Sequence, residues 1–151
     1  MLEMKDAEAL YHLIDKNRLF LSNWLPWVEG TTSVQDSREF IASAIAQYEH
    51  DKSFEAGIYM NSSLIGMCGI HPIDATSNTS TIGYWLSREH TGYGIATLCT
   101  KFLIDYALKE LKLSKVSIVT HRKNHASIAI AHRLKLSLSC QESDKLIFST
   151  K

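Results

Sequence analysis

A glycine-bearing turn is the part of the sequence with the clearest capacity for chemistry. Gly92-Tyr93-Gly94 follows a polar loop and leads into a strongly periodic stretch, which predicts a turn that opens a long helix. The first N–H groups of a helix have no partner, and the helix dipole adds partial positive charge there. The turn therefore predicts a pyrophosphate site, with Thr97 adding a hydroxyl. A plain tight turn is the alternative, because neither a third glycine nor a G-K-[ST] sequence follows.

A second candidate lies about thirty residues further along the chain. Asn124-x-x-Ser127 follows the β-branched residues 115–120, which predict a strand, and it opens another helix. Taken alone, the pattern is an N-cap asparagine with a serine in the first turn. His121 and His125 are four residues apart but lie on either side of the loop–helix junction, with no carboxylate nearby, so no metal site is expected.

The charge balance limits how any anionic ligand can be held. Sixteen Lys and Arg residues balance sixteen Asp and Glu residues, so the formal net charge of the 151-residue chain is zero. Such a chain has no bulk positive field to attract nucleic acid or an anionic membrane. Only seven glycines and two prolines are present, which makes a cluster of glycines informative. An anionic ligand must be bound by local geometry, and the glycine turn is the natural place for it.

The cysteines and the first residues indicate the compartment. Three cysteines form an odd count with no C-x-x-C motif, which argues against a disulfide framework and fits a reducing cytoplasm. The first eight residues have neither a cationic start nor an apolar run, so no signal peptide is expected. No apolar stretch approaches the roughly 18 residues of a membrane-spanning helix. We therefore expect a cytoplasmic protein.

The order of helices and strands shows how these motifs are positioned. Asp6 can cap a first helix that ends near Asn17, and Ser33 with Asp36, or Thr32 with Gln35, can form the capping box of a second. Strands are expected at residues 54–60, 64–70, 79–86 and 115–120. Helices begin after Gly94 and Asn124, and residues 136–149 have room for two short strands. Antiparallel strands followed by a strand–helix–strand unit predict a mixed sheet.

Taken together, the two motifs and their order resemble the GNAT acetyltransferase superfamily, and more narrowly its RimJ/RimL-like branch, which includes ribosomal-protein N-acetyltransferases. The resemblance covers nearly the whole chain as one acetyltransferase domain, residues 1–151. The segments that carry it, in the family's order, are Asp6-Ala7, Asn17-Arg18, Leu21-x-x-Trp24-Leu25-Pro26-Trp27, Gly69-x-His71-x-Ile73-Asp74, Ile82-Gly83-Tyr84-Trp85-Leu86, Gly92-Tyr93-Gly94-Ile95-x-Thr97 and Asn124-x-x-Ser127.

The resemblance implies an α+β fold with a three-layer α/β arrangement. Its sheet is mixed and mostly antiparallel, is flanked by helices, and has the family's fourth strand splayed from its fifth. The family's first strand is expected to be missing from this chain and the C-terminal strands to be shortened. Edge strands are then either absent or supplied by a partner, and a homodimer is one form such a partner could take.

The resemblance also implies acetyl-CoA as co-substrate and no metal. The pantetheine arm would bond to backbone at the strand end, the pyrophosphate would lie on the amides of residues 92–97, and Asn124 and Ser127 would face the departing thiolate. An N–H near Leu86 would stabilise the oxyanion. The residues implied in binding acetyl-CoA are Trp85, Leu86, Ser87, Gly92, Tyr93, Gly94, Ile95, Ala96, Thr97, Asn124 and Ser127, and the catalytic ones are Ser127, Asn124, His71 and Leu86.

The acceptor side is less determined by the resemblance. Trp24, Trp27, His71 and Tyr84 are the residues it implies in acceptor binding. An α-amino group, with a pKa of about 8, loses its proton more readily than a lysine amine at about 10.4, which favours a protein N-terminus as acceptor. A small-molecule amine is the alternative. His71 is the candidate general base, because its ordinary pKa suits the task; a histidine bonded to backbone within a strand is the other interpretation.

Several departures from the family pattern support a rival hypothesis. Leu134-Lys135-Leu136 replaces a Leu-Gly-Phe sequence, whereas Glu89, which stands where the turn motif usually has Gln or Arg, matters little because the backbone does the binding. Ser80 and Thr81 occupy the stretch where many relatives carry a catalytic glutamate. The rival to an N-acetyltransferase is therefore a non-catalytic CoA-binding module. In both cases the partners are small molecules or a protein amine, and neither nucleic acid nor a membrane is expected.

Overall fold

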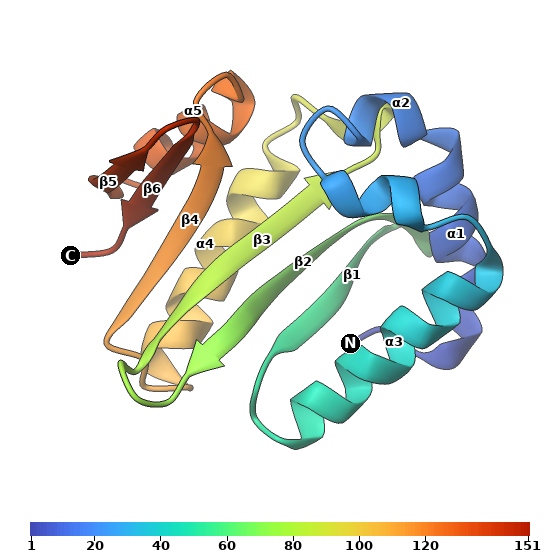
Figure 1. Ribbon diagram of the computed structural model, residues 1–151, viewed down its shortest axis with the longest axis horizontal. Helices are drawn as coiled ribbons and strands as arrows, with labels where there is room; N and C mark the ends of the chain where they lie inside the picture. Colours follow the sequence, from blue (N-terminus) through green and yellow to red (C-terminus); the bar gives the residue numbers. More distant parts are fainter.

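A mixed sheet lies between two layers of helices in the computed structural model, which describes all 151 residues (Figure 1). The strands are β1 (Phe54–Met60), β2 (Ser63–Asp74), β3 (Thr79–Leu86), β4 (Lys115–His121), β5 (Ser137–Glu142) and β6 (Lys145–Ser149). The helical elements are η1 (Met4–Asp6), α1 (Ala7–Lys16), α2 (Arg18–Leu21), η2 (Pro26–Gly30), α3 (Val34–Glu49), η3 (Arg88–His90), α4 (Ile95–Lys109) and α5 (His125–Arg133). The expected order of elements is confirmed, and no strand precedes α1.

The two central strands diverge, as expected. The sheet has the order β1-β2-β3-β4-β6-β5, and every neighbouring pair is antiparallel except β3 with β4. That parallel pair is held together through residues Thr79 to Thr81 only. Beyond this point β3 continues to Leu86 and β4 to His121 without pairing to each other, so the carboxyl ends of the two strands separate (Figure 1). The separation exposes backbone groups on the inner edges of both strands.

Each face of the sheet packs against its own set of helices. The larger core joins α4 and α5 to one face through residues such as Ile70, Ile82 and Leu103. The smaller core joins α1, η2 and α3 to the other face through Leu10, Ile41 and Met67, among others. Alternation along each strand directs successive side chains to opposite faces, so β3 contributes to both cores. None of the helices combines the length and the apolar character that a bilayer crossing requires.

Local capping explains where the helices begin. Ser33 and Asp36 form the expected capping box of α3, with the Ser33 hydroxyl accepting from the Asp36 N–H. The Asp6 prediction was wrong in its detail, because the Asp6 carboxylate accepts from the N–H of Glu3 at 2.8 Å and caps no group of α1. Asp6 thereby closes the short η1 turn that precedes the helix.

Lys135 adopts a backbone conformation that favours glycine. Its φ of 58° lies in the left-handed region, immediately after α5, where the family pattern has Leu-Gly-Phe. That conformation costs a non-glycine residue about 1–2 kcal/mol, whereas glycine adopts it freely. We expect Lys135→Gly to raise the free energy of unfolding by about 1 kcal/mol, or the melting temperature by roughly 2–4 °C. Lys135→Ala is the matched control, and an equal rise in Lys135→Ala would contradict the backbone explanation.

Candidate active site

The glycine turn forms an open cradle of backbone amides at the start of α4. Gly92 and Gly94 have φ values of 87° and 78°, and a Cβ built on either residue would meet no atom within 4 Å. The first bond of this helix runs from the Leu98 N–H to the Gly94 carbonyl. None of the N–H groups of residues 92–97 donates a hydrogen bond within the protein. With the dipole of a 15-residue helix behind them, these amides suit an anionic group of a ligand.

The side chains around the cradle supply one nearby positive charge. Nη1 of Arg133, at the end of α5, lies 3.5 Å from the Thr97 hydroxyl. The carboxylate of Glu89, which precedes the turn, forms an ion pair with Lys16 at 3.0 Å. This partner lowers the pKa of Glu89. No local pattern predicts the contact between Arg133 and Thr97, because the two residues are 36 positions apart.

Asn17 fixes the segment that leads into the turn. It is buried, its side-chain amide donates to the Leu13 carbonyl at 2.9 Å, and its Oδ1 accepts from the Arg88 N–H at 2.9 Å. A single side chain therefore joins the end of α1 to η3. We infer that Asn17 positions the cradle relative to the N-terminal helices without contacting a ligand itself.

Three residues lie at the end of strand β3, namely Trp85, Leu86 and Ser87. Of these, Leu86 has the backbone N–H group that is best placed to bind a ligand. The Ser87 N–H donates to the Ile65 carbonyl on β2, so strand alternation directs the Leu86 N–H to the opposite edge, toward the gap beside β4. Ser87 is fully buried, and its hydroxyl lies 2.6 Å from Nδ1 of His90. Trp85 shares the edge orientation of Ser87 and pairs in register with Met67. The backbone N–H groups of Trp85 and Ser87 thus face β2 and not the gap.

Ser127 and Tyr84 join the two sides of this gap. Tyr84 is on β3 and Ser127 in the first turn of α5, and their hydroxyl oxygens are 2.7 Å apart. Asn124 is the N-cap of α5, and its Oδ1 accepts from the Ser127 N–H at 3.1 Å. Burial raises the pKa of Tyr84, so the phenol keeps its proton. A phenol that donates to Ser127 leaves the serine proton free for another acceptor.

His71 faces a carboxylate that the sequence analysis did not identify. Its Nδ1 lies 2.6 Å from Oε1 of Glu55 on β1, and the Glu55 side chain is only 14% exposed. Contact with Glu55 raises the pKa of His71. Two glycines make room for the pair, because a Cβ on Gly69 would lie 2.3 Å from a Glu55 oxygen and one on Gly83 would lie 3.0 Å from the imidazole of His71.

A cavity of about 590 Å³ opens beside this pair, between β1–β3 and the N-terminal helices. His71, Glu55 and Tyr84 line it together with Trp27. Trp24 does not line the cavity; its ring instead packs against that of His121 on β4, with centroids 5.9 Å apart. The cavity thus unites three of the four residues expected to contact the acceptor. A second hollow of about 600 Å³ lies between α1 and the β1–β2 turn and shares no residue with it.

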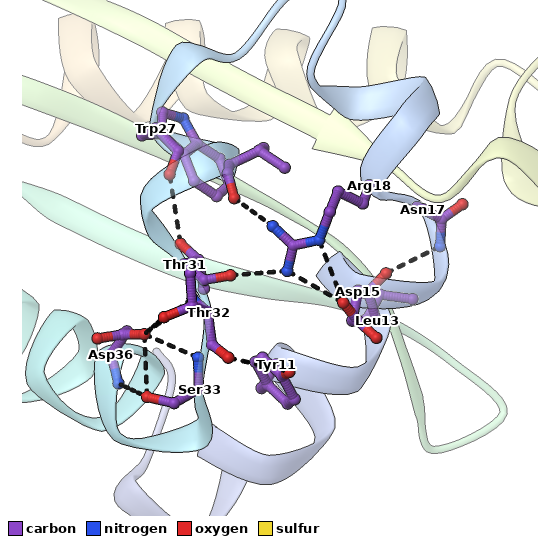
Figure 2. Close-up of polar contacts among 11 residues, drawn as sticks. Tyr11, Leu13, Asp15, Asn17, Arg18, Trp27, Thr31, Thr32, Ser33 and Asp36 are labelled. Atoms are coloured by element: carbon purple, nitrogen blue, oxygen red, sulfur yellow. Dashed lines mark hydrogen bonds and ion pairs between the residues drawn. The ribbon is translucent and has the colours of Figure 1, made fainter.

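Arg18 shapes the wall of the cavity that carries Trp27 (Figure 2). Its guanidinium donates to the carbonyls of Val28 at 2.6 Å and Thr31 at 2.7 Å. It is held in place by Asp15, whose carboxylate lies 3.1 Å away. The segment around η2 has few backbone hydrogen bonds of its own. The two hydrogen bonds from the Arg18 guanidinium therefore hold it in place of regular secondary structure. Asn17-Arg18, seen in the sequence as a motif, thus has two separate positioning roles.

Comparison with known proteins agrees with this geometry. Residues 1–137 match the family described as Acetyltransferase (GNAT) domain. YdaF of Bacillus subtilis (strain 168) is 38% identical over 135 residues, which cover 89% of this chain and 74% of YdaF. The ribosomal-protein-serine acetyltransferase of Escherichia coli (strain K12) is 28% identical over 84% of this chain and 71% of its own length.

Solved structures share the fold. The microcin self-immunity acetyltransferase MccE, in complex with acetyl-CoA and AMP, has a TM-score of 0.90 at 26% identity and covers 98% of this chain and 88% of its own. The ribosomal alpha-N-protein acetyltransferase RimL, in complex with coenzyme A, has a TM-score of 0.93 at 21% identity and covers 99% and 90%. No group of three or more His, Cys, Asp or Glu side chains in the structure could hold a metal ion.

Proposed function

Because the chain belongs to the GNAT acetyltransferase family and uses acetyl-CoA as its acetyl donor, we propose that its acceptor is the α-amine of a protein N-terminus, of the ribosomal-protein type. The amine attacks the thioester directly while both substrates are bound. The Escherichia coli relative, named as a ribosomal-protein-serine acetyltransferase, supports a ribosomal-protein acceptor. An acceptor of this kind would place the reaction in the cytoplasm, and a homodimer stays a prediction.

One observation carries the proposal. The unpaired amides of residues 92–97 begin α4, which packs against β3; the free edge of Leu86 lies on β3 itself, and the cavity with His71 and Glu55 borders the same strand. An acyl donor along the gap and an amine in the cavity would therefore meet at β3. Holding two reactants in such a geometry supplies a large part of the acceleration that acyl transfer requires.

The chemical step assigns one role to each group. The amine nitrogen attacks the thioester carbonyl carbon, a C–N bond forms, and the Leu86 N–H stabilises the oxyanion. The C–S bond then breaks, and Ser127, which Tyr84 orients, donates a hydrogen bond to the CoA thiolate that leaves. His71 takes the proton that the amine loses, and Glu55 holds the imidazole. Asn124 fixes the first turn of α5 that carries Ser127.

An experiment that measures both binding and turnover distinguishes an N-acetyltransferase from a non-catalytic CoA-binding module. Acetyl-CoA at saturating concentration should raise the melting temperature, and peptides with a free N-terminus should cause release of free thiol. A non-catalytic CoA-binding module would give the thermal shift without thiol release from any amine. The pairing of His71 with Glu55 supports the catalyst, because a module that only binds CoA has no use for a base in the adjoining cavity.

Ser127→Ala should lower kcat by about tenfold to 100-fold and leave the KM for acetyl-CoA nearly unchanged, because the hydroxyl acts on the thiolate that forms late in the reaction. Tyr84→Phe should lower kcat less, since Ser127 keeps its own proton. Steady-state thiol release measures both variants, with Ser137→Ala on the exposed strand β5 as the control. A proportional rise in KM without loss of kcat would assign Ser127 to binding alone.

A further inference from the structure

A buried hydroxyl in the wall of the acceptor cavity has no partner. Ser37, in the second turn of α3, is 1% exposed, and its Oγ makes no hydrogen bond in the protein. The residue lines the same cavity as His71 and Glu55. A serine inside a helix usually bonds a carbonyl one turn earlier, as Thr100 does with Ala96 at 2.7 Å. The Ser37 hydroxyl bonds neither such a carbonyl nor any other group. An alanine of nearly the same size would avoid the free-energy cost of this buried, unpaired hydroxyl.

The charges around this hydroxyl restrict what could bind it. Glu55 contributes a carboxylate to the cavity wall and His71 an imidazole, and Asp36, whose carboxylate caps α3, borders the same cavity. The pKa of Asp36 is lowered by backbone N–H bonds from Thr32 and by bonds with Ser33, so it stays ionised. No lysine or arginine lines the cavity. The wall therefore attracts a cationic amine and repels an acceptor that carries a carboxylate or phosphate beside it.

We propose that Ser37 forms a specificity subsite for an uncharged hydrogen-bonding group next to the reactive amine of the acceptor. The proposal rests on the proposed function, since it assumes that the cavity takes the acceptor. In a peptide this group is either the side-chain hydroxyl of the first residue or the first peptide group. Both offer a neutral partner to Ser37 within one residue of the amine, and neither brings a negative charge toward Asp36 and Glu55.

The test compares Ser37→Ala with the parent protein on two peptides that differ only in a first residue of Ser or Ala. The KM for the Ser peptide should rise about fivefold to tenfold in Ser37→Ala, the effect of losing one neutral hydrogen bond, while the KM for acetyl-CoA stays constant. Without acceptor, the melting temperature of Ser37→Ala should be unchanged or rise by roughly 2–4 °C, because an unpaired buried hydroxyl is removed. Ser137→Ala is the control for serine removal at an exposed site.

The outcomes separate the possible sources of the hydrogen bond. If Ser37→Ala raises KM for the Ser peptide alone, the partner of Ser37 is the side-chain hydroxyl of the first residue. If it raises KM equally for both peptides, the partner is the first peptide group. An unchanged KM for both peptides, with turnover intact, overturns the Ser37 subsite and leaves the proposed function standing. Turnover of a polyamine, which has no uncharged polar group, at the same rate as either peptide would overturn the subsite as well. A fall in melting temperature would instead assign Ser37 a structural role.

Discussion

Replacement of Gly94 by valine is expected to abolish the thermal shift with acetyl-CoA and to lower kcat/KM at least 100-fold, or about 2.7 kcal/mol. Gly94 has a φ of 78° and is the N-cap of α4, so the space in front of its Cα faces the open amides of the cradle. A β-branched side chain would occupy that space and would also strain the backbone, which costs it more than the 1–2 kcal/mol typical of the left-handed region.

Two further variants separate occlusion from strain. Gly94→Asn places a side chain in the same space, but asparagine tolerates the left-handed region, so it should fold normally and still bind acetyl-CoA poorly. Gly30→Ala is the matched control, because a Cβ there also meets nothing within 4 Å but the backbone angle is ordinary. Retained affinity in both Gly94 variants would mean that the turn does not hold the phosphates.

Removal of the imidazole in His71→Ala should lower kcat by about 100-fold to 10,000-fold if His71 is the general base. The loss should be larger for a lysine side-chain amine than for a peptide α-amine, because the more basic amine needs more help to lose its proton. Glu55→Gln should give an intermediate loss, since the imidazole remains but its orienting carboxylate does not. Thiol release across pH 6–9 measures all three proteins, and equal rates at every pH would remove His71 as the base.

The pH dependence of the reaction rate tests the role of His71 as a base more directly. A base must be neutral to act, so the rate should rise as pH passes the pKa of His71, which Glu55 holds above its ordinary value of about 6.5. Glu55→Gln leaves burial as the main influence, which lowers the pKa, so the acidic limb should move to lower pH. The acceptor's own titration near pH 8 does not change. The ion pair should also stabilise the folded protein below about pH 6.5 and lose this effect as pH rises through the raised pKa.

The sequence predicts the elements well because their signals are local. Thr79–Leu86 forms the strand expected at residues 79–86, and the helix after Gly94 begins at Ile95 as the glycine turn indicated. Capping at Ser33 and Asn124 depends on hydrogen bonds within four residues, so the residue types suffice to predict it. The splayed strands came from the resemblance, because no local pattern reports where two strands stop pairing.

The residues missed by sequence reasoning all act across long separations. Glu55 is 16 residues from His71 and lies on β1, the strand adjacent to β2, so only the sheet register brings the two side chains together. A charged residue among the apolar residues of the edge strand β1, with a glycine at the position on β2 that pairs with it, is the signal that could have found the pair. Ser37 carries no sequence signal, because a missing hydrogen-bond partner is visible only in three dimensions. Trp24 packs against His121 and lies outside the cavity that Trp27 lines, and only the three-dimensional path of the segment distinguishes these two tryptophans.

The most direct test of the account is mass spectrometry of a peptide after incubation with this protein and acetyl-CoA. The peptide carries a free N-terminal serine and an internal lysine, and a second peptide is identical except for a blocked N-terminus. We expect one acetyl group on the α-amine of the first peptide and none on the second. Acetylation of the lysine in both peptides, or no acetylation of either while acetyl-CoA still raises the melting temperature, would contradict it.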